Sequence, residues 1–150
     1  METENEKWIK IRADFVKLVD DAVELNKRLR DVLPNEIHDV INTLSFLHRF
    51  GTVRIDIGRA VGKTKYCIEH LDKDDVLVVP TEQAKRLVEK FVPSHAVCLS
   101  ALEIVPKSKA LSTPNRVYVD EPSEFSLEGF RSVYRALGRS TSQTFILLGG

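Results

Sequence analysis

The chain has few of the features that define the more specialised classes of protein. It contains 2 cysteines and 6 prolines among 150 residues, and its 22 basic side chains equal its 22 acidic ones. Cys67 and Cys98 lack the neighbouring cysteines and histidines of a zinc site, so we expect neither structural zinc nor a disulfide framework. The balanced charge argues against a strongly basic, non-specific nucleic-acid-binding protein, although it permits a local basic patch.

Long hydrophobic runs are also missing. No apolar segment approaches the roughly 18 residues that span a bilayer, and the acidic N-terminus lacks the basic-then-apolar order of a signal peptide. We therefore expect no membrane association and a cytoplasmic location (the host cytoplasm if the protein is viral). Apolar residues at 43% and charged residues at 29% are typical of a globular protein, and the length predicts a single domain over residues 1–150.

The first fifty residues are expected to form a helical N-terminal extension. Apolar residues recur at intervals of three and four from Trp8 to Leu29, which places them on one face of a helix. Pro34 ends that helix, because proline disfavours a helical conformation in the residue before it. A second helix follows, with apolar residues from Ile37 to Leu47 on its buried side, and Gly51 is suited to cap its C-terminus.

From residue 52 onward, short apolar runs alternate with amphipathic segments. The runs predict strands at 53–57, 76–79, 96–99, 117–119 and 145–148, with Ile104-Val105 extending or accompanying the third. The segments between them predict helices at 63–71, after Thr81 and at about 126–137. We therefore predict a three-layer α/β sandwich with a mostly parallel sheet over residues 52–150, with residues 1–50 packed on it as two added helices.

A glycine-rich segment between the first predicted strand and its helix predicts a phosphate-binding loop. It reads Gly58-Arg59-Ala60-Val61-Gly62-Lys63-Thr64. Glycines allow backbone N–H groups to surround an anion, and the helix N-terminus adds its dipole. In such a loop the lysine reaches the β- and γ-phosphates and the hydroxyl binds Mg²⁺. The candidate nucleotide-binding residues are Gly58, Gly62, Lys63, Thr64 and Lys65, and the alternative is an ordinary turn with a solvated lysine.

A second motif is the short apolar strand Val117-Tyr118-Val119, which ends in Asp120 and Glu121. An aspartate at this position would hold Mg²⁺, and the glutamate after it would activate a water molecule as a general base. In a parallel sheet both motifs would meet at the carboxyl edge. Alone, a strand ending in two acids is more often a solvated strand end. The last predicted strand ends in Leu148-Gly149-Gly150, without the polar side chain that a γ-phosphate sensor requires.

These residues resemble a known group of ATPases. Gly58-Arg59-x-x-Gly62-Lys63-Thr64 resembles the shortened Walker A motif of phage terminase large subunits, and Val78-Val79-Pro80-Thr81 is similar to motif Ia of helicase-like ATPases. Phe145 to Gly150 stands where their coupling motif would be. The resemblance covers about residues 52–150. It implies a P-loop NTPase of the RecA-like, additional-strand class that binds ATP and Mg²⁺.

By this resemblance, Lys63 and Thr64 bind the nucleotide phosphates and Mg²⁺, and Asp120 is the metal-binding acid. Glu121 is the catalytic base, and Arg59 is a second catalytic residue that senses the γ-phosphate. No upstream glutamine for adenine recognition is evident. A weaker resemblance, Asp120-Glu121-x-x-x-Phe125, is to thymidine-kinase-type enzymes, but the chain lacks the cysteines of their zinc-binding lasso.

Basic side chains in two segments are candidate contacts to nucleic acid or to a neighbouring subunit. Arg131, Arg135 and Arg139 recur every four residues on one face of the last predicted helix, and Lys107 and Lys109 lie in an acid-free basic stretch. The alternative is that these side chains form only a solvated helix face and a surface loop, with no binding role. We expect a slow ATPase that depends on oligomerisation, DNA or a larger motor protein. The alternative is a non-catalytic nucleotide-binding or regulatory module that docks on such a motor.

Overall fold

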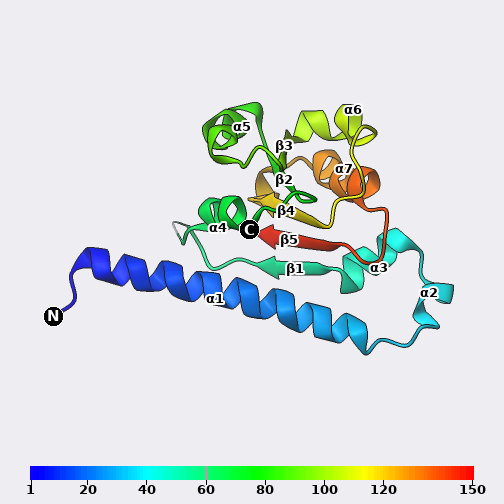
Figure 1. Ribbon diagram of the computed structural model, residues 1–150, viewed down its shortest axis with the longest axis horizontal. Coiled ribbons are helices and arrows are strands. Elements are labelled where there is room, and N and C mark those ends of the chain that lie inside the picture. The colour runs from blue at the N-terminus through cyan, green and yellow to red at the C-terminus, as the bar shows by residue number, and fades with distance from the viewer. Residues whose placement is uncertain (60) are drawn as a thin grey trace.

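The computed structural model describes residues 1–59 and 61–150, so Ala60 of the predicted loop lies outside the described residues. Five strands form one sheet in the order β1-β5-β4-β2-β3, and every neighbouring pair is parallel. The carboxyl ends of the strands therefore meet at one edge of the sheet (Figure 1). The strands are β1 (Thr52–Ile55), β2 (Val76–Val79), β3 (Val97–Ser100), β4 (Arg116–Asp120) and β5 (Thr144–Leu148).

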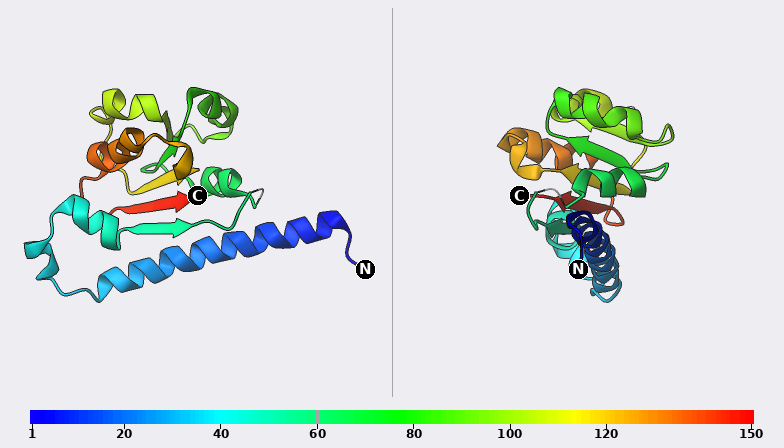
Figure 2. Two further views of the ribbon diagram at one scale, coloured as in Figure 1. Left: turned by 180° about the vertical axis from the view of Figure 1, so that it is seen from behind. Right: turned by 90° about the vertical axis from the view of Figure 1, so that its left-hand side faces the viewer.

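Helices cover both faces of this sheet, which gives the three-layer α/β arrangement that the sequence predicts (Figure 2). One face is covered by α1 (Glu4–Asp31), α4 (Lys63–His70) and α5 (Glu82–Val88). The other is covered by α3 (Thr43–Phe50), α6 (Ile104–Ser108) and α7 (Leu127–Leu137). The shorter connecting elements are α2 (Ile37–Val40) and the 3-10 turns η1 (Glu89–Phe91), η2 (Ala101–Glu103) and η3 (Pro122–Glu124).

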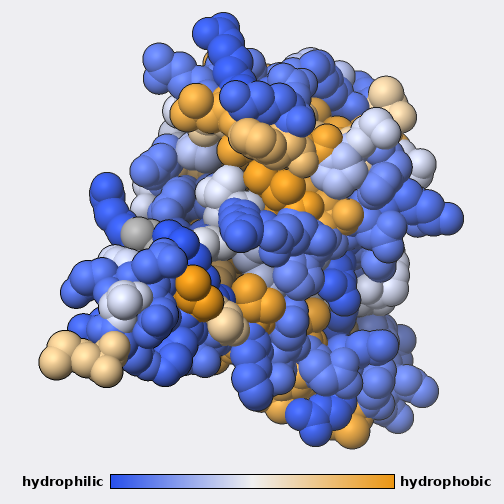
Figure 3. Space-filling view, turned by 60° about the vertical axis from the view of Figure 1, so that its left-hand side comes forward, coloured by the Kyte–Doolittle hydropathy of each residue, from blue (hydrophilic) through white to orange (hydrophobic). Residues whose placement is uncertain are grey.

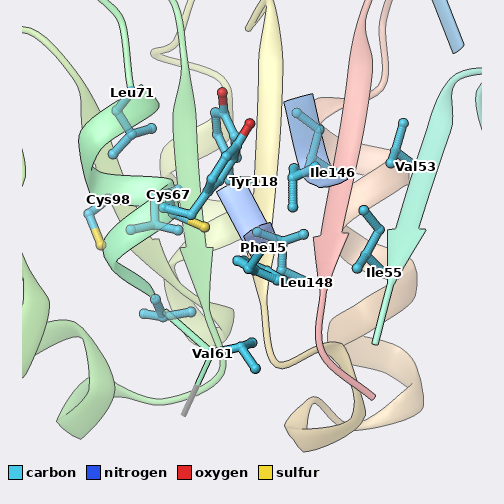
Figure 4. Close-up of a cluster of buried hydrophobic side chains, with 14 residues drawn as sticks. Phe15, Val53, Ile55, Val61, Cys67, Leu71, Cys98, Tyr118, Ile146 and Leu148 are labelled. Carbon is cyan, nitrogen blue, oxygen red and sulfur yellow. The ribbon is translucent and has the colours of Figure 1, made fainter. Parts of the chain in front are cut away.

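The hydrophobic core is divided between the two faces of the sheet. Alternate residues along a strand point to opposite faces, so Leu77 and Val79 join the cluster under α4 while Val76 and Val78 join the cluster under α7. Figure 4 shows this first cluster, to which Phe15 of α1 and Leu148 of β5 both belong. All four residues of β2 are buried, as the continuous apolar run predicts.

The long helix α1 runs along the β1 side of the sheet, and its N-terminal part extends past the carboxyl edge (Figure 1). Phe15 and Val19 are buried against the sheet. The other large residues of the predicted stripe are 39–60% exposed: Trp8, Ile11, Leu18, Leu25 and Leu29. The prediction of one continuous packed face is therefore only partly correct, because an edge strand offers too narrow a surface to cover the whole stripe.

Three boundaries differ from the sequence-based expectation. Residues 37–47 form two helices rather than one, because the side chain of Asn42 accepts a hydrogen bond from Ser45 N at 2.8 Å and caps a new helix. Strand β1 ends at Ile55, and Ile57 beyond it is 59% exposed. Ile104 and Val105 begin α6 instead of joining a strand. Thr81 caps α5, as predicted, by accepting a hydrogen bond from Ala84 N at 3.0 Å.

The polar residues of β1 are explained by the place of this strand at the edge of the sheet. The hydroxyl of Thr52 donates to Leu47 O at 2.8 Å and lies 2.9 Å from the hydroxyl of Tyr134. Arg54 is exposed. An edge strand thus tolerates side chains that a central strand would bury. Among the described residues, no helix has both the length and the hydrophobicity that crossing a bilayer requires.

Candidate functional site

The predicted loop connects β1 to α4 at the carboxyl edge of the sheet. Gly58 and Gly62 have φ angles of +122° and +94°, a backbone region that residues other than glycine rarely adopt. Gly62 is the N-cap of α4, and Lys63 and Thr64 are its first two residues. The backbone of the two glycines therefore turns the chain so that both side chains start at the positive end of the helix dipole.

The side chain of Lys63 is only 8% exposed and lies across the mouth of the loop. Its ammonium group donates a hydrogen bond to Gly58 O at 3.1 Å and forms an ion pair with the carboxylate of Glu121. A buried ammonium needs such partners, because burial without them is costly. The lysine is therefore held between the start of the loop and the acid that follows β4.

The hydroxyl of Thr64 donates a hydrogen bond to Asp120 Oδ2 at 2.6 Å. Asp120 is 7% exposed, and burial raises the pKa of its carboxyl, an effect that the hydrogen bond from Thr64 opposes. Its other oxygen, Oδ1, is buried and has no hydrogen-bond partner among the described residues. An unpartnered buried carboxylate oxygen beside a hydroxyl is a suitable ligand pair for a hard divalent cation.

Glu121 has a φ of +52°, and it is the one residue other than glycine with a positive φ in the described ranges 1–59 and 61–150. Its backbone N–H donates to Leu148 O at 2.9 Å, so the end of β5 holds the turn. Strained backbone of this kind costs free energy and is concentrated at functional sites. This left-handed conformation turns the chain away from the direction of β4, and the Glu121 carboxylate faces Lys63.

Gly149 is a residue of this site that sequence reasoning did not single out. Its φ is +115°, and a Cβ at this position would lie 2.6 Å from Glu121 Oε2. Its N–H donates to Ile55 O at 2.8 Å, and Gly150 O accepts from Ser123 N at 2.5 Å. The two glycines after β5 thus connect the end of β1 to the Glu121 turn. The sequence signal for it is the Gly149-Gly150 pair directly after the last predicted strand.

Two cavities flank α4 beside the loop, on the side of the molecule that Figure 3 brings forward. One, of about 180 Å³, lies between α1 and α4, and its lining includes Arg12, Gly62 and Tyr66. The other, of about 440 Å³, lies between α4 and α5 and is lined mainly by apolar side chains, with Thr64 at its rim. In Figure 3, apolar side chains form separate patches among hydrophilic ones. Both cavities therefore adjoin the loop along α4, and their described linings do not include Lys63, Asp120 or Glu121.

Two of the predicted site residues are not drawn into this cluster. Lys65 is 71% exposed and forms an ion pair of 3.7 Å with Glu69 on the surface of α4. Arg59 is exposed and adjoins Ala60, which lies outside the described residues. Their proposed roles in binding and catalysis stay predictions.

The basic residues of α6 and α7 lie near one another, because these two helices pack side by side (Figure 1). Arg139 donates to Ser108 O at 2.5 Å, to Leu111 O at 2.7 Å and to Ala136 O at 3.2 Å, so it holds the segment after α6 in place. Lys107 pairs with Glu103, and Arg135 pairs with Glu128 at 3.2 Å. Lys109 and Arg131 are exposed. Three of the five candidate contact residues are thus engaged within the chain.

The residues present fit Mg²⁺ together with a phosphate ligand. The described residues contain no cluster of three or more histidine, cysteine, aspartate or glutamate side chains that could hold a metal unaided. Mg²⁺ is commonly held by one or two protein ligands together with phosphate oxygens and water, and Asp120 and Thr64 supply such a pair. Comparison with known proteins finds no matching family model, no matching curated protein and no matching solved structure.

Proposed function

We propose that this protein is a RecA-like P-loop ATPase that binds Mg·ATP at the Gly58–Thr64 loop and hydrolyses it. The observation that carries the proposal is the hydrogen bond between Thr64 and Asp120, which lie 56 residues apart in the chain. It brings the hydroxyl of a glycine-rich loop and the acid of a second strand to one point, with Lys63 and Glu121 beside them. The position of β5 between β1 and β4 agrees with the additional-strand arrangement that the sequence resemblance implies.

In this proposal each residue has a distinct task. Lys63 and the loop backbone bind the β- and γ-phosphates, and the dipole of α4 adds to the attraction. Thr64 and Asp120 hold Mg²⁺, which when bound would neutralise charge on the phosphates. The cavities beside α4 leave room for the sugar and the base.

Glu121 is the general base, and its contact with Lys63 suggests how it is released. A phosphate group at the loop competes with the Glu121 carboxylate for the Lys63 ammonium. Once Lys63 binds phosphate, the carboxylate is free to orient a water molecule and accept its proton. Binding of substrate therefore prepares the base for catalysis. In this proposal the Lys63–Glu121 ion pair opens only when a nucleotide is bound.

A partner or DNA is expected to raise the rate. An arginine supplied by a neighbouring subunit or partner stabilises transition-state charge in many phosphoryl-transfer systems. A non-catalytic nucleotide-binding module that docks on a larger motor is the second candidate. The observation that favours it is the tip of β5, where Leu148 and the two glycines offer no polar side chain for sensing the γ-phosphate.

Glu121→Gln separates these two functions, because glutamine keeps the size of the side chain and removes the base. For an ATPase we expect phosphate release from Mg·ATP to be lost while ATP binding is retained. Turnover is measured alone, with single-stranded and duplex DNA, and over a range of protein concentrations. If the wild-type protein binds ATP, and Glu121→Gln leaves the protein's effect on a larger motor unchanged, the docking module is the correct function. If it neither binds nor hydrolyses ATP under any of these conditions, both are wrong.

A further inference from the structure

A third cavity, lined mainly by polar and charged side chains, lies at the opposite edge of the sheet from the phosphate loop. Its volume is about 400 Å³, and its walls come from the end of α1, from α2 and α3, and from the first residues of β4 and β5. Arg116 and Thr144, which begin β4 and β5, line it. Asp120 lies four residues along β4 from Arg116, a distance of about 13 Å at the rise of a strand. The cavity is therefore separate from the loop site.

Cations outnumber acids around this cavity. Lys27, Arg30 and Arg116 line it, and Asp31 is the single carboxylate among its lining residues. No ion pair within residues 1–59 and 61–150 includes any of the three cations. His38 also lines the cavity. In a chain with equal numbers of basic and acidic residues, this is a local positive excess.

Two of these cations are held in place by neutral partners. Arg30 donates to Gln143 O and to Thr144 Oγ1, each at 2.6 Å, and also to Thr141 O at 3.3 Å. Burial lowers the pKa of Arg30, and Asp31 acts in the opposite direction. Arg116 is half-buried, and its guanidinium lies 3.4 Å from the hydroxyl of Tyr118. Asp31 acts on Arg30 and Asp75 acts on Arg116, but among the described residues neither carboxylate forms an ion pair with these partly buried guanidinium groups. An anion in the cavity would give them a direct charged partner.

We propose that this cavity binds the phosphate group of a small molecule. Phosphate oxygens suit guanidinium and ammonium donors, and Asn115, Thr141 and Ser142 line the cavity as further polar partners. The volume lies within the range of small-molecule sites, and the lining residues gather around one hollow rather than along an extended groove. Free pyrophosphate and the phosphate of a mononucleotide share this chemistry, so both serve as probes.

The experiment follows backbone amide chemical shifts by NMR while pyrophosphate or AMP is added to the full chain carrying Lys63→Ala. This variant removes the loop lysine, so the remaining shifts report on other sites. We expect shifts at Asn115, Arg116 and the 141–144 segment. Tighter binding of AMP than of pyrophosphate would identify a nucleotide as the ligand, and the reverse order would identify a free phosphate; either supports the proposal. Absence of shifts at the amino edge at about 10 mM ligand, well above a millimolar Kd, would overturn it.

Three substitutions of exposed residues test the chemistry without depending on a core position. Lys27→Gln should weaken binding about tenfold, as expected for loss of one charge-assisted hydrogen bond. Asp31→Asn should strengthen it severalfold, and it should not harm folding because an acid at a helix C-terminus is unfavourable. Lys17→Gln, with the same charge change on the same helix, is the control and should leave affinity unchanged.

Two results would contradict the proposal. Equal weakening by Lys27→Gln and Lys17→Gln would mean that only overall charge matters. Binding of a thymidine decanucleotide without binding of pyrophosphate or AMP would mean that the surface recognises a nucleic-acid strand instead. The test is independent of the ATPase proposal, because shifts at the 62–64 loop amides of the wild-type protein report on that site separately.

Discussion

Gly149→Ala tests whether the end of β5 positions the proposed catalytic base. The new methyl group would lie 2.6 Å from Glu121 Oε2 and 3.3 Å from Glu121 Cα, so a movement of the side chain alone would not relieve the contact. Glu121 is itself tied by its N–H to Leu148 O at 2.9 Å. We therefore expect the whole Glu121 turn to shift and the Lys63 ion pair to break.

The magnitude has two parts. A side chain at φ +115° costs roughly 1–3 kcal/mol of backbone strain. Overpacking against Glu121 adds roughly another 1–3 kcal/mol. The sum is about 2–6 kcal/mol of unfolding free energy, which urea denaturation followed by circular dichroism measures directly. In the same variant we expect ATP turnover to fall far more than ATP affinity.

Gly58→Ala is the matched control for the steric part. Gly58 has nearly the same φ, +122°, but no atom of the described residues lies within 4 Å of a Cβ built there. In the absence of nucleotide, backbone strain alone should lower the unfolding free energy of this variant, by roughly 1–3 kcal/mol. If Gly149→Ala is no less stable than Gly58→Ala, and its turnover equals that of the wild-type protein, then Gly149 does not position Glu121.

Three further predictions concern the metal, the pH response and the loop after α6. Asp120→Asn should abolish the effect of Mg²⁺ on ATP affinity, measured by titrating ATP with and without Mg²⁺; an unchanged Mg²⁺ effect would exclude Asp120 as a ligand. Burial opposes ionisation of the Glu103 carboxyl, but hydrogen bonds from Lys107 and Lys85 outweigh it and lower the pKa from 4.5 to about 2. The folded state therefore binds a proton at Glu103 less tightly than the unfolded state does. The stability that Glu103 contributes is present above pH 4.5 and lost as pH falls toward 2, and Glu103→Gln should reduce that loss in acid-unfolding curves. Arg139→Ala should cost about 1–3 kcal/mol in urea unfolding because it removes three hydrogen bonds to carbonyls, whereas Arg131→Ala, an exposed position on α7, should change stability by less than about 0.5 kcal/mol.

The elements of the fold were largely predictable because their signals are local. Alternation of short apolar runs with amphipathic segments identified the strands, and the cap at Thr81 marked a helix start. Ile104-Val105 was misassigned because two apolar residues fit a strand and a helix equally well. The missed signal was Ser100 with Glu103 three residues later, a pattern that starts a helix; Ser100 N donates to Glu103 Oε1 at 3.1 Å.

The arrangement of the elements was less predictable, because it depends on contacts between distant parts of the chain. The run Phe145–Leu148 does not by itself indicate that β5 inserts between β1 and β4, and only the resemblance to additional-strand ATPases implies that order. That insertion places β1 at an edge, which explains why Arg54 is tolerated there and why α1 leaves residues such as Leu25 exposed. A helical stripe shows which residues share a face, but the width of the surface beneath decides which of them are buried.

The same contrast holds at the candidate site. Lys63, Thr64, Asp120 and Glu121 were identified from two short motifs, because each motif is contiguous in the chain. Gly149 was not identified, because its importance depends on the position of Glu121 across the sheet. Sequence motifs thus predicted the charged and hydroxyl groups, whereas the residue that makes space for one of them required the structure.

The most direct test of the account is isothermal titration of Mg·ATP into the wild-type protein, Lys63→Ala and the control Lys17→Ala. Lys63 is buried at the centre of the proposed site, whereas Lys17 is exposed on α1. We expect the wild-type protein and Lys17→Ala to bind with equal affinity, and Lys63→Ala to bind about a hundredfold more weakly because it loses charge-assisted bonds to two phosphates. Equal binding by all three proteins, or no heat from a demonstrably folded wild-type protein, would contradict the proposal that this loop binds a nucleotide.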